Sequence, residues 1–344
     1  MAVKLKKLEE QVVVITGATS GIGLATARQA AERGAKLVLA ARDGDALDTL
    51  AHEMRQRGAE VATVAADVGD PADVTRIGKA AVEKFGRVDT WINNAGVGIF
   101  GTLEQVTLED MQRLFQTNFW GVVHGSLEAV KLLRAHGGGA IINLGSEVSD
   151  SSVPLQGTYA ASKHAIKAFT ESLRMELEKD KVPISMTLIK PAAIDTPFPK
   201  HAKNYMQQEP ALPLPIYSPE LAARTILHAA EVPERDLFVG GGAKFMSVLS
   251  QLLPRSMDRL MRGGAYEQQQ SSKPSAPNRR DALHSPDARQ ELRQRAGLTP
   301  KPIDKNLYTT LGMHSTATKT VLVGGALLAA YALWRKPKLG AWHA

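Results

Sequence analysis

A tyrosine and a lysine stand one helical turn apart in the stretch YAASK, at Tyr159 and Lys163. Residues four apart lie on the same face of an α-helix, so the lysine ammonium can approach the phenol. A phenol has a pKa of about 10 and is a poor base at neutral pH. A nearby ammonium favours the phenolate and lowers that pKa. The pair is therefore predicted to exchange a proton near neutral pH, although the same spacing occurs in ordinary helices.

A glycine-rich turn, TGATSGIG at residues 16–23, follows the first apolar run and opens a helical pattern. We expect Gly17 to allow a tight turn, Gly21 to let the backbone approach a pyrophosphate, and Gly23 to permit close helix–strand packing. The helix N-terminus then faces the phosphates. The turn has longer spacing than the usual dinucleotide fingerprint, and glycine turns also occur without a ligand. Three further candidate cofactor contacts lie in it: Thr19, Ser20 and Ile22.

The end of the second apolar run predicts which dinucleotide binds. In many dinucleotide-binding folds an acidic residue about 20 residues past the glycines binds the ribose 2′-hydroxyl. Here the stretch LAARD places Ala41 and Arg42 at that point. A guanidinium can bind a 2′-phosphate through charge-assisted hydrogen bonds. We therefore expect NADP(H) to be preferred over NAD(H); Arg42 as a plain surface arginine is the alternative.

These residues need a scaffold, and from residue 11 to about 240 short apolar runs alternate with Ala-rich helical segments. Nearly continuous apolar runs are typical of parallel strands buried on both faces, and the alternation implies a doubly wound α/β sheet. The predicted strands are 11–16, 36–41, 60–65, 88–92, 139–144, 183–189 and 236–239. The predicted helices are 22–33, 45–57, 71–85, 107–135, 158–180 and 218–231.

Four motifs on this pattern together resemble the short-chain dehydrogenase/reductase (SDR) family. They are the TGxxxGxG turn, NNAG at 93–96, GS at 145–146 and YxxxK at 159–163. The likeness covers residues 10 to about 240 in the family's order and spacing. It implies a Rossmann fold with a mainly parallel seven-stranded sheet, and an NAD(P)-dependent oxidoreductase that interconverts an alcohol and a ketone or aldehyde.

The resemblance also implies a role for each matched residue. Tyr159 matches the catalytic acid/base, and Ser146 matches the residue that hydrogen-bonds the substrate oxygen. Lys163 matches the lysine that acts on this tyrosine and also binds the nicotinamide ribose. Asn118, in FQTNFWG, matches an asparagine that holds a water leading to Lys163. The other implied cofactor contacts are Asp67 at the adenine ring, Val68, Asn94, Ala95, Gly96, Pro191 and Thr196. Ala192 departs from the family's frequent Pro-Gly after the sixth strand. No metal site is expected.

By the same resemblance, residues 197–217 are expected to form a substrate lid. An apolar lid would suit a lipid-like, terpenoid or steroid-like alcohol or ketone, whereas packing of the lid on its own domain is the alternative. The apolar residues are Phe198, Tyr205, Met206, Leu212, Leu214 and Ile216. The segments 107–135 and 158–180 would pack against a second subunit, so a homodimer or homotetramer is expected.

Charge is distributed unevenly along the 344 residues, whose net charge is +7. Acidic residues outnumber basic ones by three in residues 1–240, whereas basic residues are in excess by ten in residues 241–344. Nucleic-acid binding by the body is therefore disfavoured, because it would need a basic face there. The basic tail could meet an anionic membrane surface or be solvated. The chain has no cysteine, which excludes disulfides and thiolate sites.

The sequence divides into four predicted segments. Residues 1–240 form the catalytic domain, and residues 241–262 an amphipathic helical extension interrupted near Pro254. Residues 263–313, rich in Gln, Ser, Pro and Arg, are expected to be a flexible linker. Residues 314–344 contain 15 uncharged residues at 320–334, short of the roughly 20 needed for a full span. Membrane attachment of this helix is expected, because the linker would let it reach a bilayer and its flanks would mark an interface; docking on the body or on the dimer partner is the alternative.

Three functions follow from these patterns. The leading one is an NADP(H)-dependent oxidoreductase whose catalytic domain is cytoplasmic, where that cofactor is available. A dinucleotide-binding sensor or scaffold without turnover is the second, against which the retention of Ser146, Tyr159, Lys163 and Asn118 argues. The third is a membrane-interaction or partner-binding protein. Deletion of residues 265–344, followed by activity and membrane-pelleting assays, would separate the first from the third.

Overall fold

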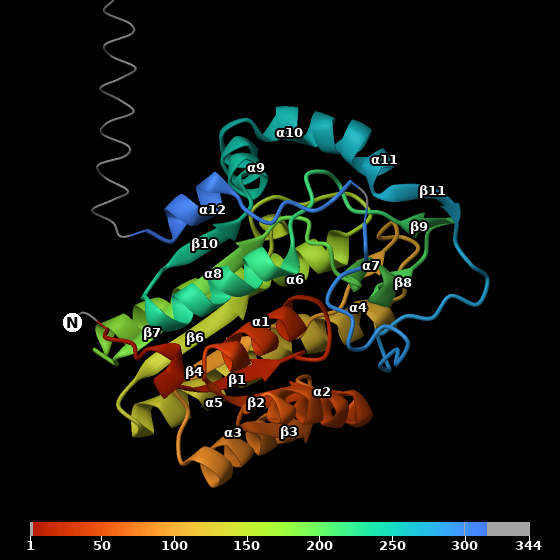
Figure 1. The fold of residues 1–344 in the computed structure, drawn as a ribbon. Helices are drawn as coiled ribbons and strands as arrows, with labels where there is room; N and C mark the ends of the chain where they lie inside the picture. The colour runs from red at the N-terminus through yellow and green to blue at the C-terminus, as the bar shows by residue number, and fades with distance from the viewer. Residues whose placement is uncertain (1–2, 299, 315–344) are drawn as a thin grey trace, which may run out of the picture.

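A seven-stranded parallel sheet forms the centre of the molecule (Figure 1), which a computed structural model describes for residues 3–298 and 300–314. The strands are β1 (Val12–Thr16), β2 (Lys36–Ala41), β3 (Val61–Ala65), β4 (Thr90–Asn93), β6 (Gly139–Leu144), β7 (Ile184–Pro191) and β10 (Asp236–Val239). Their order is β10-β7-β6-β4-β1-β2-β3, and every neighbouring pair is parallel. The chain leaves β1 in one direction and resumes with β4 on the other side, so a crevice opens at their carboxyl ends. The predicted doubly wound Rossmann fold is confirmed.

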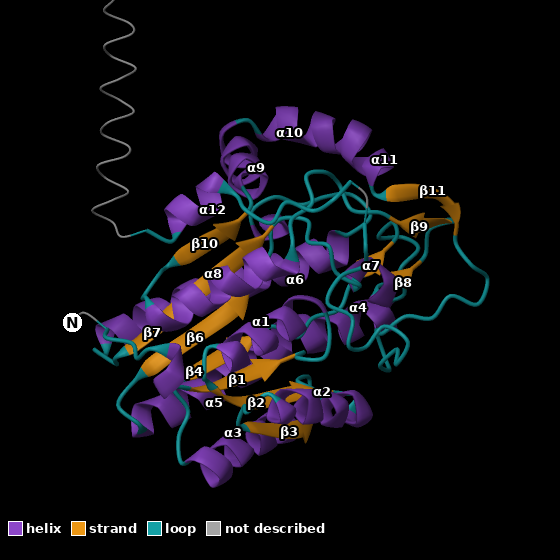
Figure 2. Cartoon of the chain, in the orientation of Figure 1, coloured by secondary structure: helices purple, strands orange, loops and turns teal. Residues whose placement is uncertain are grey.

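Helices cover both faces of the sheet (Figure 2). They are α1 (Gly21–Glu32), α2 (Gly44–Gln56), α3 (Pro71–Phe85), α4 (Leu108–Phe115), α5 (Gly121–Ala135), α6 (Gly157–Lys179) and α8 (Pro219–Glu231). Side chains fix where several begin: Asp43, Asp70 and Ser218 accept hydrogen bonds from backbone N–H groups in the first turns of α2, α3 and α8. The single helix expected at 107–135 is instead interrupted between α4 and α5 by a π-helical turn, η2 (Gln116–Trp120).

The core has two halves because successive residues of a strand point to opposite faces. Val13 and Ile15 of β1 pack with residues of α1, α2 and α8. Val12 and Val14 pack with residues of α3, α5 and α6. All five residues of β1 are buried, as expected for a central parallel strand. The sheet is thereby a rigid platform for the loops at its carboxyl edge.

The lid region contributes three short elements at that edge. They are α7 (Phe198–His201), β8 (Lys203–Asn204) and β9 (Gln208–Pro210). Strand β8 pairs with β5 (Ile99–Phe100), which follows β4. Strand β9 pairs with β11 (Gln270–Pro274) from the C-terminal extension.

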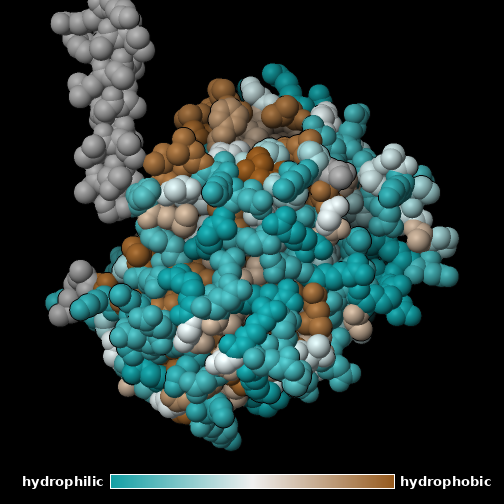
Figure 3. All heavy atoms as spheres, in the orientation of Figure 1, coloured by the Kyte–Doolittle hydropathy of each residue, from teal (hydrophilic) through white to brown (hydrophobic). Residues whose placement is uncertain are grey.

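The extension begins with helices that lie beyond the arrowhead of β10 (Figure 1). These are α9 (Gly241–Leu252), α10 (Pro254–Leu260), the π-helical turn η4 (Met261–Ala265) and α11 (Tyr266–Gln268). Pro254 begins a new helix, because proline has no N–H to donate and is tolerated in the first turn but not in a helix interior. Apolar side chains gather on the outside of α9 and α10 (Figure 3), where Phe245 and Leu252 are 65% and 72% exposed.

Residues 263–313 differ from the flexible linker expected there. Besides α11 and β11, they form α12 (Leu307–Gly312), and the segment between β11 and α12 bonds to the body. Arg279 pairs with Glu209 at 3.1 Å, and Arg295 pairs with Glu220 at 2.7 Å. Polar side chains and backbone groups thus hold a segment that has few large apolar residues.

The C-terminal apolar segment predicted at 320–334 lies outside the described residues. Among residues 3–298 and 300–314, no helix has the length and apolar character needed to cross a bilayer.

Candidate active site

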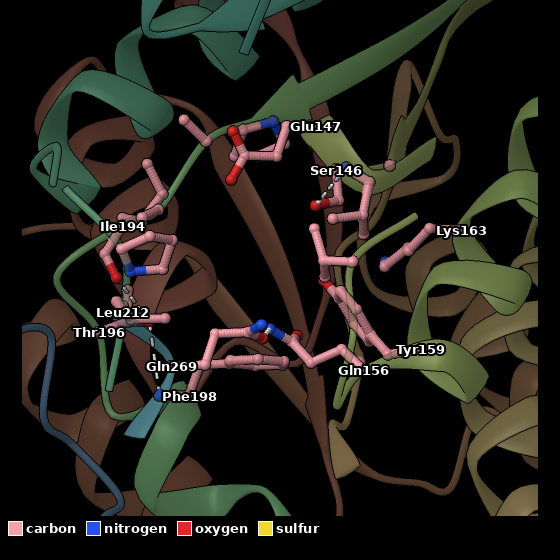
Figure 4. Close-up of a pocket in the computed structure, with 18 of the residues that line it drawn as sticks. Ser146, Glu147, Gln156, Tyr159, Lys163, Ile194, Thr196, Phe198, Leu212 and Gln269 are labelled. Atoms are coloured by element: carbon pink, nitrogen blue, oxygen red, sulfur yellow. Dashed lines mark hydrogen bonds between the residues drawn. The ribbon is translucent and has the colours of Figure 1, made fainter. Parts of the chain in front are cut away.

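Ser146, Tyr159 and Lys163 face one cavity at the carboxyl edge of the sheet (Figure 4). Ser146 follows β6 and caps a short 3-10 turn, η3 (Glu147–Ser149). Tyr159 and Lys163 lie in the first turns of α6. The lysine Nζ lies 5.5 Å from the centroid of the tyrosine ring and donates to the backbone oxygen of Leu144 at 2.8 Å. The structure therefore brings together the three side chains that the motifs predicted.

The protonation of this group is governed first by burial. Burial raises the pKa of Tyr159; the Glu147 carboxylate raises it further, while a hydrogen bond to Ser146 lowers it. Burial also lowers the pKa of Lys163 to about 8. Desolvation of the phenol therefore moves the pKa of Tyr159 in the direction opposite to the one expected from the Lys163 ammonium. Tyr159 is held as a neutral phenol, which is the form that donates a proton.

The Asn118 side chain is linked to the backbone of Tyr159 through the hydroxyl of Ser162. It lies fully buried in the π-helical turn η2, and its side chain exchanges two hydrogen bonds with the backbone of Val97, at 2.8 and 3.0 Å. Its Nδ2 also donates to the Ser162 hydroxyl at 3.2 Å, and that hydroxyl donates to the Tyr159 carbonyl at 2.7 Å. The amide side chain therefore connects the loop after β4 to the first turn of α6.

The glycine turn has the geometry that its sequence predicted. Gly17 and Gly21 have φ values of +64° and +53°, which side chains disfavour. A Cβ on Gly23 would lie 2.0 Å from the carbonyl oxygen of Gly17. Asn94 holds the turn by donating to the carbonyl oxygens of Thr16 and Gly17 at 2.9 and 3.1 Å. The first N–H groups of α1 lack partners one turn earlier in the helix, so this cradle fits the phosphates of a dinucleotide.

The predicted cofactor residues nearest the cavity surround it. Those that line it are Gly17, Ser20, Gly21, Ile22, Asn94, Ala95, Gly96, Pro191 and Thr196. The side chain of Thr196 packs against Gly21, and a Cβ added to this glycine would lie 3.1 Å from the Thr196 Cβ. A Cβ on Gly96 would lie 3.9 Å from Lys163 Nζ. The glycine turn and the tyrosine–lysine pair therefore open on the same space.

Five other predicted contacts, namely Thr19, Gly23, Arg42, Asp67 and Val68, lie outside the cavity lining. The Arg42 guanidinium donates to the backbone oxygens of Ala282 and Leu283, the latter at 3.2 Å. Asp67 pairs with Arg113 at 2.5 Å. Thr19 and Val68 are both buried, at 3% and 7% exposure. Arg42 and Asp67, predicted for the adenosine end of the cofactor, are thus bonded to other parts of the chain.

The cavity has a volume of about 470 Å³, and its walls are largely apolar. The lid supplies Phe198, Leu212 and Leu214, with the Phe198 ring centroid 5.3 Å from that of Tyr159. The helical extension supplies Met246, Leu260 and Met261. The other apolar lid residues, Tyr205, Met206 and Ile216, do not line it; the Tyr205 hydroxyl donates to Asp110 at 2.6 Å.

The polar residues of the cavity that sequence reasoning missed include Glu147, Gln156 and Gln269. Glu147 could have been found, because it directly follows Ser146. Burial raises its pKa to about 7. Gln156 Nε2 donates to Gln269 Oε1 at 2.6 Å, and Gln269 also donates to the Pro154 carbonyl at 2.9 Å. No local pattern identifies Gln269 as a cavity residue, since Gln156 and Pro154 are more than 100 residues away in the chain.

Comparison with known proteins decides the family. A family model described as short chain dehydrogenase matches residues 11–207. The chain belongs to this family. The uncharacterized oxidoreductase YxnA of Bacillus subtilis (strain 168) is 45% identical over 337 residues, which cover 97% of this chain and 92% of that protein. The similarity to YxnA therefore includes the C-terminal extension.

Solved short-chain dehydrogenase/reductase structures share the fold. One from Burkholderia phymatum, in complex with NAD, has a TM-score of 0.67 and 30% identity, covering 72% of this chain and 95% of its own. L-sorbose reductase from Gluconobacter frateurii, complexed with NADPH and L-sorbose, has a TM-score of 0.60 and 28% identity, covering 70% and 98%. As a short-chain dehydrogenase/reductase, the present chain is an oxidoreductase, and its matched motifs meet at one cavity.

Proposed function

We propose that this enzyme interconverts an apolar alcohol and its ketone or aldehyde with NADP(H), and that Tyr159 is the general acid/base. The observation that carries the proposal is the convergence of Ser146, Tyr159, Lys163 and the glycine turn on one cavity. When bound, the nicotinamide ring supplies the hydride to a carbonyl carbon or accepts it from an alcohol carbon. The chain's own residues bind, orient and exchange the proton.

Two hydroxyl groups serve the substrate oxygen. During reduction that oxygen gains negative charge, and the Ser146 and Tyr159 hydroxyls donate hydrogen bonds to it. Tyr159 then gives its phenolic proton to the oxygen and becomes a phenolate. The Lys163 ammonium favours that phenolate, because opposite charges a few ångströms apart attract strongly in a buried site. The raised pKa of Tyr159 supports this assignment in the reducing direction, since the phenol begins protonated.

The preference for NADP(H) rests on Arg42. The two similar structures bind NAD in one case and NADPH in the other, so family likeness leaves the choice open. In this chain the end of β2 presents Arg42 rather than a carboxylate. A guanidinium matches a phosphate with two parallel hydrogen bonds, whereas a carboxylate would repel it.

The lining of the cavity supports an apolar substrate. Met246, Leu260 and Met261 face it from one side, and Phe198, Leu212 and Leu214 from another. The volume of about 470 Å³ falls within the range of small-molecule sites, and the substrate shares it with the nicotinamide end of the cofactor.

Assembly with a second copy is part of the proposal. Helices α5 and α6 leave large apolar side chains in solvent: Leu127 is 52% exposed and Met175 is 62% exposed. Trp120, at the junction of η2 and α5, is 47% exposed. A face of this kind fits the homodimer or homotetramer expected from the sequence.

A substrate screen followed at the nicotinamide absorbance, with both cofactors, tests the function. On any substrate found, Tyr159→Phe is expected to lower turnover by about 10²–10⁴-fold, the usual contribution of a positioned acid or base. Cofactor binding should survive, because only the hydroxyl is removed. Turnover within a few-fold of wild type would contradict the role of Tyr159.

A further inference from the structure

A segment of the C-terminal extension, residues 281–293, lies on the groups expected to hold the adenosine and phosphates of the cofactor. The Gly21 N–H, at the start of α1, donates to the Arg293 carbonyl at 3.0 Å. The Leu292 N–H donates to the Thr19 carbonyl at 2.8 Å. Arg42 donates to the carbonyls of Ala282 and Leu283. Both ends of this segment thus bond to the proposed dinucleotide site, and we call residues 281–293 the strap.

The strap also brings negative charge to this site. Burial raises the pKa of the Glu291 carboxyl group, whereas Thr19 of the glycine turn and the Arg42 guanidinium lower it. Glu291 and Asp281 both interact favourably with the Arg42 charge. Phosphate groups of a dinucleotide would make contacts of the same kind with a helix N-terminus and a guanidinium. The strap therefore presents carbonyl and carboxylate oxygens where the proposed ligand would present phosphate oxygens.

The buried Leu283 and a contact between His284 and Asp110 help to hold the strap beside α4, where it is drawn in blue in Figure 1. Leu283 is 0% exposed and packs in a cluster with Val97, Ile99, Val106 and Leu114. His284 Nε2 lies 2.7 Å from Asp110 Oδ1 of α4. Burial of a leucine side chain makes this contact specific, because an extended backbone alone would not select one position.

The described cavity agrees with this arrangement. It reaches Gly17, Gly21 and Ile22 and extends to Tyr159, but neither Thr19 nor Arg42 lines it. The nicotinamide and substrate side is open, whereas the adenosine side is filled by the chain itself. The strap and a dinucleotide cannot occupy the adenosine side at the same time, because both use the same N–H and guanidinium groups.

We propose that the strap is an autoinhibitory segment that NADP(H) must displace in order to bind. The inference rests on the proposed dinucleotide site. A protein whose binding-competent form is only a fraction of the population binds with an apparent Kd raised by the inverse of that fraction. Changes that loosen the strap therefore tighten cofactor binding, and changes that fasten it weaken cofactor binding.

Loosening is tested in the full-length chain with Leu283→Ser. The matched control is Leu307→Ser, since Leu307 lies in the same extension but is 75% exposed. Titration with NADPH, followed by nicotinamide fluorescence, is expected to give a Kd about tenfold lower for Leu283→Ser than for wild type, as a larger competent fraction requires. Leu307→Ser should match wild type. An unchanged or higher Kd for Leu283→Ser would overturn the proposal.

The strap can be fastened with an engineered disulfide, because the sequence has no cysteine that could form a competing one. The Ala282 N–H donates to the His201 carbonyl at 2.7 Å, so these positions are neighbours. The double variant His201→Cys/Ala282→Cys would close one disulfide across the strap. The oxidised form is expected to bind NADPH at least about tenfold more weakly than the reduced form of the same protein. Equal affinity of the two forms would refute the proposal, and tighter binding in the oxidised form would show instead that the strap closes over bound cofactor.

The outcomes separate this inference from the proposed function. Binding of NADPH with one affinity in wild type, Leu283→Ser and both redox forms refutes the strap and leaves the oxidoreductase assignment standing. Absence of NADPH and NADH binding in every form, including Leu283→Ser, refutes the proposed dinucleotide site and the strap with it.

Discussion

Glu147 should make the stability of this protein depend on pH in a direction opposite to that of most carboxylates. Its carboxyl group faces the cavity beside Ser146, and no hydrogen-bond or ion-pair partner for it occurs among the described residues. Desolvation raises its pKa from an ordinary value of 4.5 to about 7. The folded protein therefore holds the proton more tightly than the unfolded chain does.

The sign follows from that difference. Below about pH 4.5 Glu147 is protonated in both states and costs nothing. As pH rises toward 7, the Glu147 carboxyl group ionises in the unfolded chain before it ionises in the folded protein. Folding then requires uptake of a proton or burial of a charge, and either lowers the free energy of unfolding. Each pKa unit corresponds to 1.36 kcal/mol, so a rise of about 2.5 units lowers the free energy of unfolding by at most about 3 kcal/mol above pH 7. Roughly 2 kcal/mol of that loss falls between pH 5 and 7.5.

Urea unfolding of wild type and Glu147→Gln at several pH values checks this reasoning. The amide has nearly the same shape and does not titrate, so any packing cost is the same at each pH. The stability of Glu147→Gln relative to wild type is expected to rise by about 2 kcal/mol between pH 5 and 7.5. A difference that stays constant across this range, or that favours wild type at the higher pH, would refute the raised pKa.

Two further changes test the cofactor and the assembly. Arg42→Asp should shift the ratio of NADPH to NADH affinity toward NADH by about tenfold or more, because a charge-assisted pair is replaced by repulsion; an unchanged ratio would exclude Arg42 as the discriminator. Leu127→Glu, on the exposed face of α5, should lower the mass measured by light scattering, whereas Leu103→Glu, at an equally exposed leucine, should leave it unchanged. A wild-type monomer at micromolar concentration would count against the proposed assembly.

Local pattern was sufficient for the scaffold and for the motif residues. The apolar runs marked all seven strands, because buried parallel strands differ clearly from the helices between them. The spacing of Tyr159 and Lys163 predicted their proximity, since a helical turn fixes it. The π-helical turn around Asn118 was missed, because the residues of 107–135 fit one helix equally well and the extra residue shows only in hydrogen bonding.

Contacts between distant segments account for what the sequence did not predict. Gln269 lies in a run of Gln and Ser that reads as a linker, yet it is only 2% exposed and is bonded to Gln156. Composition reports how much apolar area a segment can bury, but it does not report hydrogen bonds that the segment finds on a preformed body. The direction of the Tyr159 pKa shift depends on the same closure, because lid and extension residues help to wall the cavity.

Arg42 links the choice of cofactor to the strap, and its two effects can be separated. Displacing the strap costs the same free energy whichever dinucleotide enters, so the strap scales both affinities together. Only NADP(H) offers Arg42 a 2′-phosphate in exchange for the neutral carbonyls of Ala282 and Leu283, and an anionic acceptor adds ion-pair attraction and two parallel hydrogen bonds. Leu283→Ser should therefore tighten NADPH and NADH binding by the same factor, whereas Arg42→Asp should change their ratio. A change of ratio in Leu283→Ser would mean that the strap itself reads the 2′-phosphate.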